Sequence, residues 1–139
     1  MRVLIVEDET SSYENLREIL HEINPEIEIA GNTESVVQTI NWLKSNPAPD
    51  LIFMDIHLSD DSAFAIFDKI NVETPIVFTT AYDQYAIDAF KVNSIDYLLK
   101  PIKVNAVEHA IEKFNKLNHT DITHYLSQLM LLAPSSRRR

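Results

Sequence analysis

The chain of 139 residues contains no cysteine and a single glycine, Gly31. Without cysteine there can be no disulfide, no thiolate metal site and no cysteine nucleophile. A dinucleotide-binding fingerprint needs three spaced glycines, and a P-loop needs two glycines followed by a lysine and a serine or threonine. The single glycine therefore excludes both of these nucleotide-binding motifs.

The sequence also lacks long apolar runs and a basic surface. No run approaches the roughly 18–20 apolar residues that cross a bilayer, and the first short run meets acid at Glu7, which argues against a signal peptide. The net charge is −9, and such a surface repels nucleic acid and anionic lipid. The three terminal arginines, 137–139, are interpreted as a solvated end. We therefore expect a soluble, cytoplasmic protein without membrane contact.

Apolar residues make up 45% of the chain, which is enough for one packed domain. Most of the short apolar runs are continuous, as in strands covered on both faces, and the alternating run at 26–30 is expected at a sheet edge. The predicted strands are at about 2–6, 26–30, 50–55, 75–79 and 94–99.

A helical pattern follows each predicted strand. Ser11 and Glu14 have the spacing of a capping box for the first helix, Asn32 or Thr33 can cap the second, and Asp83 can cap the fourth. The expected inner faces are, in chain order, Leu16, Ile19, Leu20 and Ile23; Val36, Val37, Ile40 and Leu43; Phe64, Phe67 and Ile70; Ala86, Ile87, Ala89 and Phe90; and Val104, Val107, Ile111 and Phe114. Such alternation predicts an α/β fold with a parallel sheet, helices on both faces and right-handed crossovers.

Polar residues follow the buried strands. Glu7 and Asp8 follow the first, Asp55 ends the third, Thr80 follows the fourth and Lys100 follows the fifth. Because parallel strands gather their carboxyl ends at one rim, where ligands of open α/β sheets bind, these groups could share one small site.

The composition of this predicted site favours a cation and a phosphoryl group. Carboxylates within a few Å of one another repel, and such a cluster usually binds a cation or keeps a proton. Oxygen ligands without cysteine or a histidine pair favour Mg²⁺ or a similar ion such as Mn²⁺. A lysine ammonium pairs readily with a phosphoryl group.

These motifs together resemble the receiver domain of response regulators, over roughly residues 1–118. The matching segments are 4–8, 52–55, 80–81 and 96–101. The segment 78–86 is similar to receivers of the LytR/AlgR type, which carry a LytTR DNA-binding domain downstream. The resemblance implies a flavodoxin-like or CheY-like fold: a doubly wound, five-stranded parallel sheet of order 2-1-3-4-5 with five helices.

The resemblance also implies a role for each acidic residue and for the lysine. Asp55 is the phosphoacceptor, a nucleophile toward the phosphohistidine of a sensor histidine kinase. Asp8 and Asp55 bind Mg²⁺ directly, Glu7 acts through water, and the backbone carbonyl of His57 completes the protein ligands. Lys100 pairs with the phosphoryl group. The protein would be a phosphorylated switch rather than a turnover enzyme.

The switch implied by the resemblance involves Thr80, which hydrogen-bonds to the phosphoryl group, and Tyr97, which changes rotamer. The Lys100–Pro101 bond is expected to be cis. The affected surface comprises the fourth helix, fifth strand and fifth helix, and a homodimer is expected through it, with Lys91 and Asp96 as candidate contacts.

Two departures from the family pattern lie in the loop after the acceptor. Many receivers have proline where this chain has Ser59 and glycine where it has Ala63. We therefore expect the loop at 60–64 to differ in shape, with consequences for kinase specificity. A separate hypothesis is that Tyr82 shields the phosphoryl group from water and slows dephosphorylation.

The predicted domain plan is a receiver at 1–118, a helical extension at 119–132 and a linker or tail at 133–139 toward an effector domain outside this chain. The extension could continue the fifth helix or form a separate one. Its apolar stripe could pack back on the domain or contact another chain.

Three alternatives to a phosphorylated receiver differ in their requirements. A receiver-like module that works without phosphorylation would not need the four residues Asp8, Asp55, Thr80 and Lys100. A Mg²⁺-dependent phosphatase of the haloacid dehalogenase type needs a second aspartate at the position of His57. In a flavodoxin-like FMN carrier, the acidic residues 7–9 would repel the flavin phosphate.

Overall fold

The computed structural model describes the backbone of residues 1–81 and 94–131, and the side chains of 1–81 and 94–117. The predicted fourth helix lies outside these residues, as do its cap Asp83, the candidate contact Lys91 and the proposed shield Tyr82. The helix labels accordingly pass from α3 to α5.

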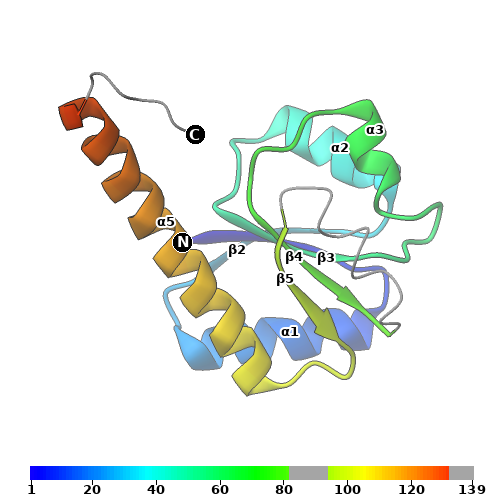
Figure 1. The fold of residues 1–139 in the computed structure, drawn as a ribbon. Helices are drawn as coiled ribbons and strands as arrows, with labels where there is room; N and C mark the ends of the chain where they lie inside the picture. The colour runs from blue at the N-terminus through cyan, green and yellow to red at the C-terminus, as the bar shows by residue number, and fades with distance from the viewer. Residues whose placement is uncertain (82–93, 132–139) are drawn as a thin grey trace.

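Five parallel strands form one sheet in the order β2-β1-β3-β4-β5 (Figure 1). This confirms the predicted fold class and strand order. β3 and β4 are buried along their whole length, as their continuous apolar runs predict, whereas β2 and β5 are the edges. The strands are β1 Arg2–Val6, β2 Glu28–Thr33, β3 Leu51–Asp55, β4 Ile76–Thr80 and β5 Ser94–Leu99.

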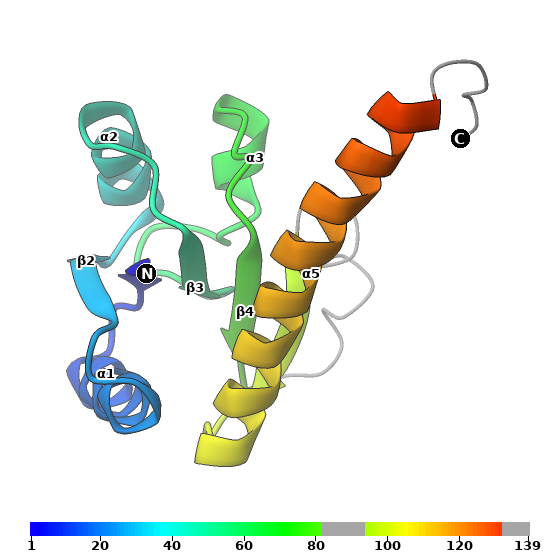
Figure 2. The same ribbon diagram turned by 90° about the vertical axis from the view of Figure 1, so that its left-hand side faces the viewer.

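The helices cover both faces of the sheet. The described ones are α1 Thr10–Ile23, α2 Val36–Ser45, α3 Ala65–Lys69 and α5 Val104–Leu131. α1 and α5 pack on one face, and α2 and α3 lie on the other (Figure 2). The two sides have separate cores, so the sheet is doubly wound as predicted.

Successive residues of each central strand serve opposite cores, because side chains alternate across a strand. In β1, Val3 and Ile5 join the core under α1 and α5, whereas Leu4 and Val6 join the core under α2 and α3. In the second core the ring of Phe78 lies 5.2 Å from that of Phe64, centroid to centroid. Both cores fix the strands that lead to the predicted site.

The first helix begins earlier than its predicted capping box. α1 starts at Thr10 after the N-cap residue Glu9, and Tyr13 N–H donates to the Glu9 carbonyl at 3.0 Å. Ser11 and Glu14 both lie inside the helix, so the capping-box prediction is wrong. The Ser12 hydroxyl instead donates to the Glu9 carboxylate at 2.5 Å.

The second strand runs further than predicted and moves the start of the second helix. Residues 31–33 continue β2 because they pair with residues 4–6 of β1. Asn32 and Thr33 are therefore strand residues and not caps. The cap is Ser35, whose hydroxyl accepts a hydrogen bond from Gln38 N–H at 3.0 Å.

The inner face of α2 also differs from the prediction at one position. Val37 is 61% exposed, while Val36 is buried, and the partly buried Ile40 and Leu43 pack against the core. The shifted helix start turns Thr39 inward instead. The Thr39 hydroxyl lies 2.7 Å from the Thr33 hydroxyl and donates to the Ser35 carbonyl at 2.7 Å, so this buried polar group is satisfied.

α5 is one continuous helix from Val104 to Leu131, so the extension at 119–131 continues it instead of forming a separate helix. Val107, Ile111 and Phe114 are buried and Val104 is partly buried, as predicted for the inner stripe. The far half of α5 extends past the sheet in both views (Figures 1 and 2). In the described part of the chain no helix combines the length and apolar character needed to cross a membrane.

Gly31 of β2 lies directly against the indole ring of Trp42 of α2. A Cβ atom at position 31 would come within 2.7 Å of Trp42 Nε1. We predict that Gly31→Ala lowers the free energy of unfolding by about 1–3 kcal/mol through overpacking. Urea denaturation measures this loss. In a Trp42→Leu background the same substitution should cost much less, and an equal loss in both backgrounds would contradict this explanation.

Candidate functional site

Three carboxylates meet at the carboxyl ends of β1 and β3. Glu7, Asp8 and Asp55 each contribute an oxygen atom, and these atoms lie within 4.8 Å of one another. Glu7 and Asp55 are buried, whereas Asp8 is exposed. With Glu9, Ala81 and Lys100 they line a hollow of about 420 Å³.

Lys100 carries the positive charge of the site. Its Nζ lies 2.8 Å from Glu7 Oε1 and 3.0 Å from Asp55 Oδ2. The end of β5 sets its place: Lys100 N–H donates to the Thr80 carbonyl at 2.8 Å, and the Lys100–Pro101 bond is cis as expected. Burial acts to lower the pKa of Lys100, but the hydrogen bonds to both carboxylates and their charges outweigh it and raise the pKa.

Glu7 is the acid whose protonation this environment changes most clearly. Burial is the largest cause, and with the charge of Asp55 it raises the pKa of Glu7 to about 7, against the opposing hydrogen bond from Lys100. The single positive charge of Lys100 thus does not balance the negative charge of the nearby carboxylates. The site can be neutralised by a proton on Glu7 or by a bound cation, and its hard oxygen donors fit Mg²⁺ or Mn²⁺.

The β2 edge holds the turn that carries Glu7 and Asp8. Glu7 N–H donates to the Thr33 carbonyl at 2.9 Å. The Asn32 side-chain amide donates to the carbonyls of Ile5 and Glu7 at 3.1 and 3.2 Å. This contribution of Asn32 was not predicted, because its place in the sequence indicates a helix cap.

The loop after β3 folds back on itself behind Asp55. His57 N–H donates to Asp55 Oδ1 at 3.1 Å, and the His57 side chain is exposed. Ala63 N–H donates to the Ile56 carbonyl at 2.7 Å, and His57 and Ser62 form an antiparallel bridge. One oxygen of Asp55 thus faces its own loop and the other faces Lys100.

Thr80 and Tyr97 lie on neighbouring strands, but neither is among the described residues that line the hollow. Thr80 is fully buried and directly precedes Ala81, which does line it. Tyr97 is partly buried against the core under α2 and α3. Asp96 accepts a hydrogen bond from Tyr97 N–H at 2.8 Å and pairs with Lys113 of α5 at 3.3 Å.

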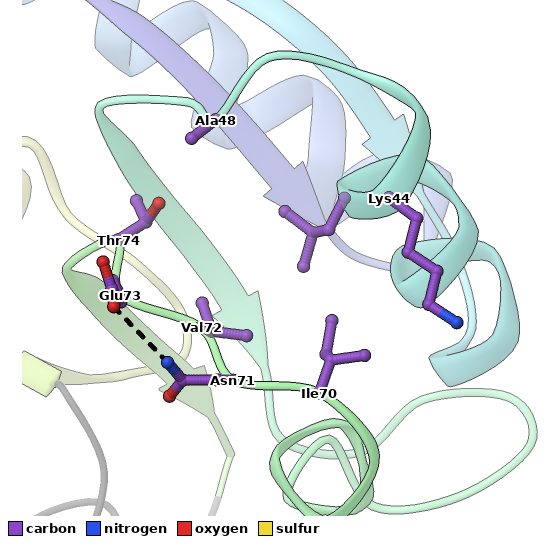
Figure 3. Close-up of a pocket in the computed structure, with 8 residues that line it drawn as sticks. Lys44, Ala48, Ile70, Asn71, Val72, Glu73 and Thr74 are labelled. Atoms are coloured by element: carbon purple, nitrogen blue, oxygen red, sulfur yellow. Dashed lines mark hydrogen bonds between the residues drawn. The ribbon is translucent and has the colours of Figure 1, made fainter.

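A second hollow, of about 340 Å³, lies beside the amino ends of β3 and β4 (Figure 3). Aliphatic side chains form much of its wall, with Asn71 and Glu73 hydrogen-bonded at its rim at 3.4 Å. None of the predicted site residues lines it. The acidic hollow at the carboxyl ends is therefore the candidate site.

Comparison with known proteins agrees with this geometry. Residues 3–112 match the model of the response regulator receiver domain family. The sensory transduction protein LytT of Bacillus anthracis is 38% identical over 125 residues, covering 88% of this chain and 50% of that protein. The transcriptional regulatory protein LytR of Staphylococcus aureus (strain N315) is 39% identical over 116 residues, covering 81% of this chain and 46% of that protein.

This chain is also similar to a solved structure of a response regulatory domain. The response regulatory domain of protein mrkE from Klebsiella pneumoniae is similar with a TM-score of 0.74 and 27% identity, covering 84% of this chain and 97% of that one. The chain thus spans about half the length of the curated relatives it matches, and nearly all of a solved receiver domain.

The raised pKa of Glu7 predicts a pH-dependent stability without divalent cations. The folded protein binds this proton more tightly than the unfolded chain does, so the contribution of Glu7 to stability is complete below about pH 4.5 and is lost as the pH rises to about 7. Relative to Glu7→Gln, the wild-type free energy of unfolding should fall by up to about 3 kcal/mol over this range. Urea denaturation of both proteins with a chelator measures the difference, and a difference independent of pH would contradict the prediction.

Proposed function

Because the chain belongs to the response-regulator receiver family, we propose that it accepts a phosphoryl group on Asp55 from the phosphohistidine of a sensor histidine kinase, with Mg²⁺ as cofactor. The observation that carries this proposal is the convergence of Glu7, Asp8 and Asp55 with Lys100 Nζ, 3.0 Å from Asp55 Oδ2. Phosphoryl transfer depends mainly on positioning and charge neutralisation, which such a site supplies.

Asp8 and Asp55 would hold Mg²⁺, or Mn²⁺, directly, Glu7 through water, and the His57 carbonyl would complete the protein ligands. Carboxylate and carbonyl oxygens suit this ion, and the excess of negative charge supports it. When bound, the ion would offset negative charge on the phosphoryl oxygens.

In the transfer step a carboxylate oxygen of Asp55 would form the new bond to phosphorus while the phosphorus–nitrogen bond of the phosphohistidine breaks and imidazole leaves. The Lys100 ammonium lies 3.0 Å from Asp55 Oδ2 and would hold this carboxylate in place for the transfer. After transfer the same ammonium would pair with the phosphoryl oxygens.

The chain would act as a switch rather than a turnover enzyme. Thr80 would move inward as its hydroxyl hydrogen-bonds to the phosphoryl group. The Tyr97 ring would then fill the space that Thr80 leaves. Thr80 lies on β4 and Tyr97 on β5, and these strands are paired, with Phe78 opposite Tyr97 and Thr80 opposite Leu99. This pairing supports a response in which the two residues move together. Phosphorylation would bias a pre-existing balance between two surface states.

The proposed output surface consists of the segment 82–93, β5 and α5, and a homodimer would form through it. Asp96, one candidate contact, pairs with Lys113 at 3.3 Å within the single chain. Forming the dimer through Asp96 would therefore require this partly exposed ion pair to open or to be shared.

We propose that residues 1–118 form the receiver, 119–132 a helical extension and 133–139 a linker or tail. The curated relatives, of which this chain covers about half, support a regulator in which a LytTR-type DNA-binding domain follows this receiver, and we propose that it acts in the cytoplasm. Nucleic acid would then be bound only by that further domain.

We predict that incubation with acetyl phosphate and Mg²⁺ adds one phosphoryl group, seen in the intact mass spectrum. Asp55→Asn should add none, because the amide is not a nucleophile for this step. Chelation should abolish the addition in the wild type. An unmodified wild-type protein would instead favour the alternative of a receiver-like module that works without phosphorylation.

We predict opposite effects of Asp8→Asn with and without Mg²⁺. In chelator the variant should melt a few degrees above the wild type, because one repelling charge leaves the cluster. Addition of Mg²⁺ should raise the melting temperature of the wild type but not of the variant. Asp61→Asn, which changes an exposed carboxylate outside the cluster, serves as the control and should respond to Mg²⁺ like the wild type.

A further inference from the structure

The loop after Asp55 is fastened to the start of α2. The Asp60 carboxylate accepts hydrogen bonds from Val36 N–H at 2.8 Å and Val37 N–H at 3.2 Å. Next to it, the Ser59 hydroxyl donates to the Glu34 carbonyl at 3.1 Å. Three hydrogen bonds therefore join this loop to an element about 25 residues earlier in the chain.

The chemistry of a helix start explains why Asp60 is held there. The first N–H groups of a helix have no acceptor within the helix, and a negative charge near them is favourable. The Ser35 hydroxyl accepts the hydrogen bond from Gln38 N–H, so the N–H groups of Val36 and Val37 remain available to the Asp60 carboxylate. The hydrogen bond from Val36 is the largest cause that lowers the pKa of Asp60, which keeps the carboxylate charged.

Residues just before α2 also hold the loop after β1, which carries Glu7 and Asp8. The Thr33 carbonyl accepts from Glu7 N–H at 2.9 Å, and the Asn32 amide donates to the Glu7 carbonyl at 3.2 Å. Residues 32–37 thus contact both loops that contribute ligands to the proposed Mg²⁺ site. One loop follows β1 and the other follows β3, and β1 and β3 are neighbours in the sheet.

We propose that Asp60 is a positioning residue for the Mg²⁺ site: by fastening its loop to α2, it fixes the backbone that presents the His57 carbonyl to the ion. This inference rests on the proposed function. Partners that orient ligands without touching the ion typically change metal affinity by about 10–100-fold when they are removed. The Asp60 contacts to α2 are of this kind, because they act on the loop backbone and not on the ion.

The first test is the Kd for Mg²⁺, measured by calorimetry on the wild type, Asp60→Ala, Asp60→Asn and Asp61→Ala. Asp61→Ala removes the same charge from the same loop, but among the described residues the Asp61 carboxylate accepts only a local hydrogen bond, from Ser62 N–H at 2.7 Å. We expect about tenfold weaker binding for Asp60→Ala and little change for Asp61→Ala. Asp60→Asn should lie between, because its amide oxygen can still accept from Val36.

The second test needs no variant. Coupling between two sites is reciprocal, so an ion that is favoured by the Asp60 contacts must in turn strengthen them. Saturating Mg²⁺ should slow hydrogen exchange at the amides of Val36 and Val37 in the wild type. The amide of Gln38, held by Ser35 in the next position of the helix, should respond less.

The outcomes distinguish a failure of this inference from a failure of the proposed function. Equal weakening by Asp60→Ala and Asp61→Ala would show an effect of charge alone and would overturn the inference. Normal Mg²⁺ binding by Asp60→Ala, together with hydrogen exchange at Val36 and Val37 that Mg²⁺ leaves unchanged in the wild type, would overturn it as well. A wild-type protein that does not bind Mg²⁺ would overturn the proposed function, and this inference with it.

Discussion

One ammonium group between two buried carboxylates is the constraint on which this end of the molecule depends. Lys100 lies 2.8 Å from Glu7 and 3.0 Å from Asp55, and Asp8 adds a further negative charge at the rim. Such a group of charges is tolerated only where the chain keeps each partner in place. The sheet does so because β1, β3 and β5 all end at this site and are packed from both faces.

The sequence was sufficient for the central strands and for the polar residues that follow them. Continuous apolar runs identified the central strands, and parallel pairing brings their carboxyl ends together whatever the details of the connections. Glu7, Asp8, Asp55 and Lys100 therefore converge as predicted from their places in the chain. The sequence could not give the ion pairing itself, because each distance depends on rotamers and loop shape.

The errors concern features that distant contacts decide. Asn32 and Thr33 have good capping side chains, but pairing with β1 is worth more than a local cap and draws them into β2. Asp60 bonds to a helix start 24 residues earlier, and no local pattern reports a bond of that kind. The contacts of polar loop residues thus depend on the surrounding fold, and they cannot be predicted from the neighbouring residues in the sequence.

The uninterrupted course of α5 has a mechanical consequence. From Leu117 to Leu131 the helix rises about 21 Å at 1.5 Å per residue, without a break at the polar stretch. A rod of this length converts a tilt of about 10° where it leaves β5 into a displacement of roughly 4 Å at its tip. Small adjustments beside the sheet would thereby be magnified at the far end of the helix.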